Sequence, residues 1–342
     1  MPPPRMARQA RAILAWVMFL AIPLQAASPA TKLLENADEW FQSEDARRAL
    51  DHLLSWQTDA GDWPKNIDTV SQPFTDDLTK PNGTFDNGAT SGELRVLARA
   101  YRLTGKPRYK QAFLRGFQHI LDAQYDHGGW PQYYPLSQVY HRHVTFNDGA
   151  MIRLMEFLRD TASHEDFGWL DADQRQAAKA AVERGVDCIL KCQIIVKDVP
   201  TVWCAQHDAE TLAPVAARSF ELASLSGAES AEILHFLMSL EAPSPAVARA
   251  VQAGVAWFQT ARIEGYQYQK SKTEPALKKD PAAPSLWARF YEIESNRPIF
   301  SDRDGVMKYD IEEIGSELRS YSWYGTWGSQ VLDQYAHWAH RN

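Results

Sequence analysis

Apolar residues recur at helical spacing in a set of segments that resemble one another. The segments are ALDHLLSWQ (residues 49–57), GFQHILDAQ (116–124) and GVDCILKCQ (185–193). Each has two adjacent apolar residues at its fifth and sixth positions and ends in glutamine, and the copies lie 67 and 69 residues apart. A fourth copy, GVAWFQTAR (254–262), keeps the 69-residue step but lacks the glutamine. The apolar spacing predicts that these segments are related helices.

A long loop and a second predicted helix follow each of the first three copies. The loop begins with GDWP or GGWP in the first two units and is reshaped to VPTVWCAQHD in the third. The second helices are predicted at residues 90–105, 147–162 and 216–227. A helix–loop–helix unit with this period predicts a mainly α fold, an incomplete α/α toroid of about three repeats with short β or irregular segments in the long loops. Long loops in a compact domain are usually functional.

The second helix of the first two units is preceded by almost the same polar turn, TFDNGAT at residues 84–90 and TFNDGAM at 145–151. Asp and Asn are common helix N-caps, so one interpretation is structural, and exposed cap residues contribute only roughly 1 kcal/mol to stability. However, a cap needs one such residue and each turn has two. In a toroid, equivalent loop ends would meet at one rim and direct carboxylate and amide oxygens into one cleft. That donor set suits a hard cation such as Ca²⁺.

Two further groups of polar residues have less specific patterns. Cys188, Cys192 and Cys204 are spaced poorly for a structural zinc site, and we expect buried thiols with at most one disulfide. His207, together with the neighbouring Asp208 and Glu210, could supply acid–base groups, although capping of a helix and of loop backbone is the favoured interpretation.

The N-terminal residues 1–27 have the composition of a secretory signal peptide: three arginines, an apolar run, and then QAAS. Cleavage is expected near Ala26 or Ala27, which would leave residues 28–342 as one secreted or periplasmic catalytic domain. Removal of three arginines and no acid would change the formal net charge from −7 to −10, which argues against nucleic acid as a partner. No later segment is apolar enough to cross a membrane, and we expect a monomer.

The long motifs of the chain resemble those of a known enzyme family. GDWPKN, TFDNGAT, QYDHGGWPQYYP, TFNDGAM, TVWCAQHD, ARSFELASLSGAES, WARFYEIE and PIFSDRDG together resemble the pectate lyases of polysaccharide lyase family 10, over about residues 45–325. The resemblance implies an incomplete α/α toroid. It also implies cleavage of α-1,4-linked polygalacturonate by Ca²⁺-assisted anti-β-elimination with an arginine base, giving 4,5-unsaturated oligogalacturonides.

The same resemblance assigns roles to individual residues. It implies calcium ligands at Asp86, Asn87 and Asp148. It implies that Arg303 is the base and that Arg218 and Arg289 bind substrate carboxylates. We expect Lys65 and Asn66, in GDWPKN, to bind substrate as well.

Three features of the sequence bear on these roles. Gly149 stands where a second aspartate is usual in the family, which could weaken the metal site. Asp62 stands where a glycine is usual, which would place a charge in a loop that lines the cleft. Asp302 and Asp304 flank Arg303, and if they face its guanidinium they would hold it protonated.

Two other functions remain open on the sequence alone. One is a toroid glycoside hydrolase that uses Asp86 and Asp148 as acid and base. The other is a non-catalytic pectin-binding protein. The product decides between them, because elimination gives an unsaturated uronide that absorbs ultraviolet light and hydrolysis does not.

Overall fold

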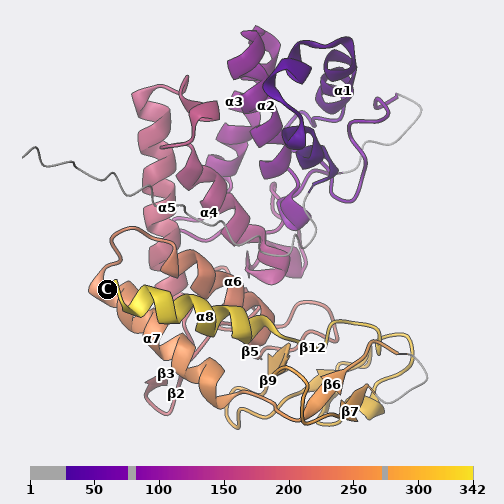
Figure 1. Ribbon diagram of the computed structural model, residues 1–342, viewed down its shortest axis with the longest axis vertical. Coiled ribbons are helices and arrows are strands. Elements are labelled where there is room, and N and C mark those ends of the chain that lie inside the picture. Colours follow the sequence, from indigo (N-terminus) through magenta and orange to yellow (C-terminus); the bar gives the residue numbers. More distant parts are fainter. Residues whose placement is uncertain (1–27, 76–81, 272–275, 342) are drawn as a thin grey trace, which may run out of the picture.

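The computed structural model describes residues 28–75, 82–271 and 276–341 (Figure 1). The predicted signal peptide, residues 1–27, and its cleavage site near Ala26 or Ala27 lie outside the described residues. The α-helices of the described residues are α1 Glu44–Ser55, α2 Ser91–Thr104, α3 Pro107–Asp122, α4 Ala150–Asp160, α5 Ala172–Cys192, α6 Gly227–Met238, α7 Pro245–Thr260 and α8 Trp327–Ala339. The short 3₁₀ helices are η1 Pro29–Glu35, η2 Asp38–Gln42, η3 Asp86–Gly88, η4 Tyr140–Arg142, η5 Asn147–Gly149, η6 Glu165–Phe167 and η7 Ile311–Glu313.

The helices form two rows that follow the chain. In one row α2 contacts α4, α4 contacts α6 and α6 contacts α8, and in the other α3 contacts α5 and α5 contacts α7. The rows pack on each other through the pairs α2–α3, α4–α5 and α6–α7, and bury apolar residues between them. Figure 1 shows α1–α5 in one half of the elongated molecule and α6–α8 in the other. The predicted incomplete α/α toroid is confirmed, with α7 and α8 as a fourth helix pair.

The repeated glutamines join successive units. The side-chain Nε2 of Gln57 donates to Gly61 O in its own loop at 2.9 Å and to Ala112 O on α3 at 2.8 Å. Gln124 makes the same pair of bonds, to its own loop and to α5, and Gln193 makes them to its own loop and to α7. Each glutamine therefore satisfies one loop carbonyl and one carbonyl of the next unit, which explains why the sequence repeats it.

A tryptophan in each loop has a similarly constant role. The indole nitrogens of Trp63, Trp130, Trp203 and Trp287 donate to main-chain carbonyls near the ends of α1, α3, α5 and α7, at 2.7–2.8 Å. All four side chains are fully buried. A buried indole needs a partner for its N–H, so these bonds fix how each loop leaves its helix.

The strands are short and pair antiparallel. The pairs are β1 Val144–Thr145 with β4 Gln206–His207, β2 Ile195–Val196 with β3 Val199–Pro200, β5 Leu225–Ser226 with β9 Phe290–Tyr291, β8 Trp287–Ala288 with β12 Tyr324–Gly325, β6 Tyr266–Tyr268 with β7 Leu277–Lys279, and β10 Phe300–Ser301 with β11 Met307–Lys308.

Single main-chain bonds extend this pairing from loop to loop. Phe85 N donates to Gln132 O at 3.1 Å, Phe146 N to Ala205 O at 2.9 Å and Gly227 N to Arg289 O at 2.8 Å. Consecutive loops are thus held side by side, in the same register in each unit.

The helix predicted at residues 216–227 is wrong. The second helix of the third unit is α6, which begins at Gly227 after the N-cap Ser226. Residues 216–224 are irregular because Arg218 and Glu221 bond to each other, main chain and side chain, in a turn. The helices predicted at 90–105 and 147–162 are confirmed as α2 and α4.

No helix of the described residues is long and apolar enough to cross a membrane. Cys188, Cys192 and Cys204 are buried free thiols, which agrees with the expectation of buried cysteines and shows no disulfide among these three.

Candidate active site

The two duplicated turns lie against each other and are not helix caps. The turns η3 and η5 are in contact. The N-cap residues of the helices that follow are Thr90 and Gly149, and neither helix receives a capping hydrogen bond from an Asp or Asn side chain. The structure therefore excludes the interpretation that these Asp and Asn side chains are helix caps. The contact between the two turns agrees with the other interpretation, in which both turns face one site.

The conformation of the turns explains why each contains two Asx residues. The second residue of each turn is left-handed, Asn87 with φ 53° and Asp148 with φ 50°. Apart from glycine, Asn and Asp adopt this conformation most readily. The first residue of each turn, Asp86 or Asn147, is buried. The inverted order of the two residues therefore places one carboxylate inside the protein and the other on its surface.

Asp86 is the buried carboxylate, with 2 % of its surface exposed. Its Oδ2 accepts hydrogen bonds from Lys65 Nζ and, at 2.7 Å, from Gln132 Nε2, whereas its Oδ1 is buried and has no hydrogen-bond partner among the described residues. Burial opposes the charge of Lys65, but the hydrogen bond and charge of Asp86 outweigh it and raise the pKa of Lys65. Asn66 Oδ1 accepts from Asn87 Nδ2 at 2.9 Å. The predicted substrate residues Lys65 and Asn66 thus lie directly on the first turn.

Asp148 carries the more accessible carboxylate, which is half-buried with 40 % of its side chain accessible, and it faces Arg289. The Nη2 of Arg289 lies 3.3 Å from Asp148 Oδ1 and 3.2 Å from Asn147 Oδ1, and it also donates to Glu229 Oε1. Arg289 is only 6 % exposed. Burial opposes its charge, yet Glu229 together with neighbouring anionic groups raises its pKa above the usual value. Arg289 is therefore a fixed, fully charged cation at the second turn.

Arg218 lies in the same network through Tyr321. Its Nε donates to Glu221 Oε2 at 2.7 Å, and the hydroxyl of Tyr321 donates to Glu221 Oε1 at 2.8 Å. Both arginines make cation–π contacts with the Tyr321 ring, whose centroid is 5.7 Å from Cζ of Arg218 and 5.0 Å from Cζ of Arg289. The hydrogen bond that Arg218 donates to Glu221 is the main reason that the pKa of Arg218 is raised.

Arg303 lies apart from this cluster. It is in the hairpin between β10 and β11, its side chain is 63 % exposed, and its Nη2 donates to Glu317 Oε1 at 2.6 Å. That hydrogen bond raises the pKa of Arg303. Asp302 and Asp304 do not hydrogen-bond to its guanidinium: Asp302 accepts main-chain N–H groups and Asp304 pairs with Lys308.

The tip of this hairpin nevertheless approaches the loop that carries Arg218. A Cβ on Gly305 would lie 3.6 Å from Ser219 O. The structure thus brings Arg303 to the Arg218 side of the cluster without any direct contact to the two Asx turns.

The two departures from the family pattern have different surroundings. Gly149 has φ +70°, and a Cβ there would lie 2.5 Å from Glu232 Oε2. Burial raises the pKa of Glu232 to about 7. Asp62 is buried, accepts a hydrogen bond from Thr58 and lies 3.3 Å from His119 Nε2. Asp62 also belongs to the lining of the cavity that includes Lys65, as expected of a cleft-lining loop, although little of its surface is exposed.

The donor set fits a calcium ion that also has ligands from outside the protein. Asp86 and Asp148 supply carboxylates, Asn87 supplies an amide oxygen, and the buried Oδ1 of Asp86 has no partner. Calcium takes six to eight oxygen ligands. Among the described residues no group of three or more His, Cys, Asp or Glu side chains converges on one point, so the protein's own carboxylates would fill only part of a coordination shell.

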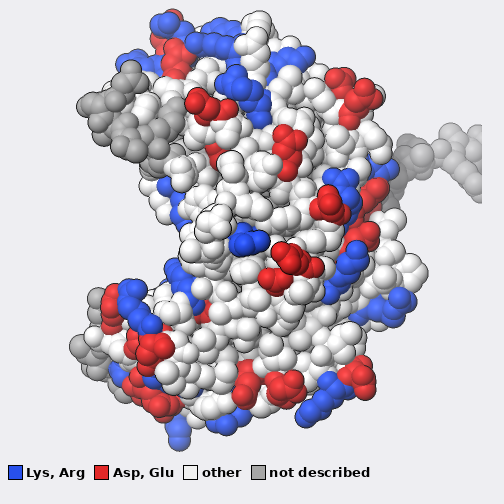
Figure 2. Space-filling model, turned by 180° about the vertical axis from the view of Figure 1, so that it is seen from behind, with Lys and Arg blue, Asp and Glu red and all other residues white. Residues whose placement is uncertain are grey.

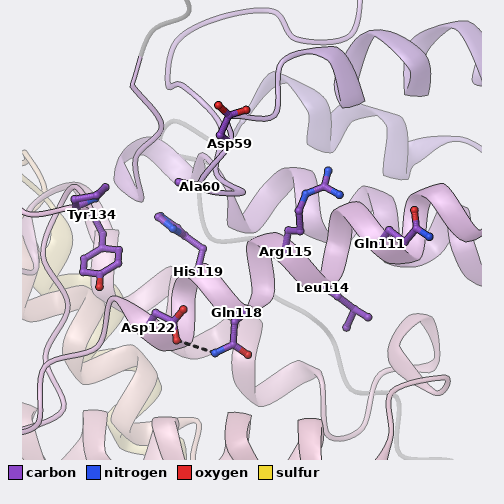
Figure 3. Close-up of a pocket in the computed structure, with 10 residues that line it drawn as sticks. Asp59, Ala60, Gln111, Leu114, Arg115, Gln118, His119, Asp122 and Tyr134 are labelled. Carbon is purple, nitrogen blue, oxygen red and sulfur yellow. Dashed lines mark hydrogen bonds between the residues drawn. The ribbon is translucent and has the colours of Figure 1, made fainter.

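A cleft adjoins this cluster. Figure 2 shows a deep hollow between the two halves of the molecule, with Lys and Arg side chains at both of its edges. A cavity of about 990 Å³ includes Lys65, Tyr133 and His141 among its lining residues. A neighbouring hollow of about 770 Å³ on α3 shares Asp59, Ala60, Tyr134 and Pro135 with it and contains none of the candidate site residues (Figure 3).

Sequence reasoning missed the residues that hold the candidate cations and Asp86 in place: Gln132, Glu221, Glu229 and Tyr321. A signal existed for Glu229. The main-chain N–H groups of Thr84, Thr145 and Ser226 each donate to the carbonyl of their loop tryptophan, so these three residues are equivalent. Glu229 lies three residues after Ser226, as Asn87 does after Thr84 and Asp148 after Thr145. The other partners come from loops whose packing the sequence pattern does not encode.

Two of the remaining acid–base candidates, His207 and Asp208, have structural roles. His207 is fully buried, accepts from Cys204 N at 3.1 Å and binds Leu212 O at 2.8 Å. Burial lowers its pKa to about 4. Asp208 accepts the main-chain N–H groups of Glu210 and Thr211. These contacts agree with the favoured interpretation that the segment stabilises its own loop.

Comparison with known proteins identifies relatives over nearly the whole chain. The family model of pectic acid lyase matches residues 57–332. Among solved structures, a mutant of the family 10 polysaccharide lyase from Cellvibrio cellulosa in complex with trigalacturonic acid is 37% identical, with a TM-score of 0.79 over 90% of this chain and 96% of that chain. Another structure of the family 10 polysaccharide lyase from that organism is 36% identical, with a TM-score of 0.79 over 92% and 97% of the two chains. A search of curated proteins finds no significant match.

Proposed function

Because the chain belongs to the pectic acid lyase family, the pectate lyases of polysaccharide lyase family 10, we propose that it cleaves α-1,4-linked polygalacturonate by Ca²⁺-assisted anti-β-elimination. The trigalacturonic acid held by the solved relative supports the substrate class. Family membership favours elimination over the glycoside hydrolase and the non-catalytic binding protein. The observation that carries the proposal is the contact between the two Asx turns, with one carboxylate beside Lys65 and the other beside Arg289.

Asp86, Asn87 and Asp148 would hold the calcium ion. When bound, the ion supplies positive charge next to the substrate carboxylate, which makes the adjacent C5 proton more acidic. The substrate carboxylates would supply oxygen ligands that the protein lacks. This division of ligands agrees with a site in which protein cations already pair with the two carboxylates.

Arg289 and Arg218 would bind substrate carboxylates. Glu229 and the ring of Tyr321 hold Arg289 in position before substrate arrives, so little reorganisation is needed when negative charge develops on the uronate. Such preorganised electrostatic stabilisation is a large part of catalysis. Lys65, in the lining of the cavity, and Asn66, which accepts a hydrogen bond from Asn87, would contact a neighbouring sugar.

Arg303 would accept the C5 proton, and the electron pair left on C5 would then expel the C4-linked sugar. Only the neutral guanidine can take a proton. Its hydrogen bond to Glu317 favours the charged form, so Arg303 must leave Glu317 before it reacts. The exposed position of the hairpin permits that movement, and an alkaline medium increases the small deprotonated fraction.

The test is the ultraviolet absorbance of 4,5-unsaturated uronides released from polygalacturonate, measured with Ca²⁺ and with a chelator. We expect absorbance to rise with Ca²⁺, to stop on chelation and to return when Ca²⁺ is restored. Release of reducing ends without ultraviolet absorbance would establish a hydrolase. Binding of polygalacturonate with no release of either kind would establish a binding protein.

We further propose that the enzyme is exported after cleavage of residues 1–27 and acts as a monomer with one catalytic domain, residues 28–342. The composition of the first 27 residues supports export. Intact mass and light scattering of the protein from the culture medium or periplasm test the cleavage and the oligomeric state.

A further inference from the structure

A buried carboxyl group lies at the start of α2, the helix that follows the first Asx turn. Glu93 is 1 % exposed. Its Oε1 accepts a hydrogen bond from the hydroxyl of Ser28, and its Oε2 is buried and has no hydrogen-bond partner within the described part of the chain. Neither the calcium site nor the substrate site described above uses this residue.

Among the residues that the structure describes, no cationic side chain lies beside Glu93. The groups that act on its carboxyl are the Ser28 hydroxyl and main-chain groups of the helix start, and burial raises its pKa to about 7. An ionised carboxylate buried without a cation is strongly unfavourable. An enzyme that works at alkaline pH would therefore have to ionise this group at considerable cost, unless a positive charge is supplied.

Ser28 is held firmly at this position. Its Oγ accepts from Ala30 N at 3.3 Å and its carbonyl accepts from Thr31 N at 3.0 Å, so it caps η1. On the other side α2 approaches so closely that a Cβ on Gly92 would lie 2.8 Å from Ser28 Cβ and 2.9 Å from Thr31 Cγ2. The nitrogen of Ser28 is separated from its own Oγ by only three covalent bonds, which keeps it roughly 3 Å from the atom that bonds to the Glu93 carboxyl.

Ser28 is also the residue that follows one of the two expected cleavage positions. We propose that processing of the exported chain ends between Ala27 and Ser28, and that the new α-ammonium group of Ser28 forms a buried ion pair with Glu93. Hydrolysis of the Ala27–Ser28 bond consumes one water, leaves a carboxylate on Ala27, and frees an amine that takes up a proton. The α-amino group has an ordinary pKa near 8, so it is charged at neutral pH.

The ion pair would link processing to the candidate active site. Glu93 lies in the first turn of α2, and Thr90 just before it accepts from Trp63 N at 3.0 Å and donates to Thr84 O at 2.9 Å. These bonds enclose the turn that carries Asp86 and Asn87. Fixing the start of α2 through Ser28 therefore also restrains this turn in the mature enzyme.

The first experiment determines the N-terminus of the exported protein by mass spectrometry, and we expect Ser28. The second is a double-mutant cycle on purified protein. The cycle uses two N-termini, one chain that begins at Ser28 and one that has a single glycine before Ser28. Each chain is made both with the native Glu93 and with the substitution Glu93→Gln. Urea unfolding at pH 7.5 should give a folding equilibrium at least about tenfold more favourable for the Ser28 chain, and Glu93→Gln should abolish that difference. Glu35→Gln, which changes an exposed carboxylate of the same segment, should leave it intact.

A further measurement covers the case in which Glu93→Gln fails to fold. The α-amine of the native Ser28 chain should react with an acylating reagent at least about tenfold more slowly than the α-amine of the glycine-extended chain, because an amine held charged and buried is a poor nucleophile. An exported chain that begins elsewhere, equal unfolding equilibria for the two chains, or equal amine reactivity would overturn the proposal. None of these measurements depends on catalysis. A negative result here would therefore leave the proposed lyase activity untouched, and a protein without lyase activity could still form the ion pair.

Discussion

Substitution of the two site carboxylates should separate their roles in stability from their roles in catalysis. The sequence suggested that both are exposed turn residues. In the structure Asp148 is half-buried and accessible to solvent, whereas Asp86 is buried against Lys65 and Gln132. Asp86→Ala and Asp148→Ala should therefore both abolish most activity but differ in their effect on folding.

The expected magnitudes follow from what each change leaves behind. Asp86→Ala removes the partner of a Lys65 side chain that is 31 % exposed and one hydrogen bond from buried Gln132. Removing one member of a fully buried pair costs about 3–5 kcal/mol. Because Lys65 retains some contact with water, we expect a loss of about 2–3 kcal/mol, and less for Asp86→Asn, which keeps the hydrogen bond to Gln132. Asp148→Ala leaves Arg289 paired with Glu229 and should cost about 0.5–1 kcal/mol.

A matched control is available at the start of α5. Asp171 is an N-cap with a capping box, so Asp171→Ala should cost about 1 kcal/mol and leave activity unchanged. The assays are urea unfolding and the ultraviolet rate on polygalacturonate across a range of Ca²⁺ concentrations. An Asp86→Ala protein that is no less stable than Asp171→Ala would refute the argument from burial. Near-normal kcat/KM in either site variant would refute the assignment of the two turns.

The remaining predictions concern the base, the departure at position 149 and the buried histidine. Arg303→Lys should lower kcat by about 100-fold or more with little change in KM, whereas Arg289→Lys should place more of its loss in KM; near-normal kcat in the first variant would exclude Arg303 as the base. Gly149→Asp should lower the free energy of unfolding by about 1–2 kcal/mol because of the positive φ at this position. It should leave the Ca²⁺ concentration needed for activity unchanged, since the new side chain would meet Glu232. A lower Ca²⁺ requirement would contradict this, and Gly149→Ala controls for backbone strain. The pKa of His207, about 4 when folded, lies below the unfolded value near 6.5, so wild-type stability should fall by up to about 3 kcal/mol as pH drops from 6.5 to 4; His207→Gln should lose this pH dependence of the unfolding free energy.

Much of the fold could be predicted because successive helix–loop–helix units repeat the same packing and hydrogen-bonding residues. The apolar pairs and the terminal glutamines mark the ends of α1, α3 and α5, where each glutamine bonds to the next unit. The prediction failed at residues 216–227, where apolar spacing suggested a helix. There the ion pair between Arg218 and Glu221 closes a turn, and the helix α6 begins only at Gly227, after its N-cap Ser226. Periodicity does not record such local bonds between side chains.

The site was predicted less completely, for a different physical reason. The sequence brought the two Asx turns together because they occupy equivalent places in successive repeats. It did not reveal that Asp86 is buried, since its partners Lys65 and Gln132 belong to two separate loops that come together only in the folded chain. Likewise Glu229, 60 residues from Arg289, fixes that arginine through a contact that depends on the pairing of β5 with β9.

The inverted order of Asp and Asn in the two turns has an electrostatic consequence. If both turns had aspartate in the buried position, two carboxylates would lie in the protein interior, and if both had it in the left-handed position, both would be exposed. Instead each turn contributes one carboxylate, and each carboxylate faces one cation, Lys65 at the first turn and Arg289 at the second. The protein alone therefore presents little uncompensated negative charge to a divalent ion. A polygalacturonate chain brings the missing anions and can itself pair with Lys65 and Arg289, which would release Asp86 and Asp148 toward the ion. This charge arrangement favours a calcium ion shared between enzyme and substrate over one held by the enzyme alone.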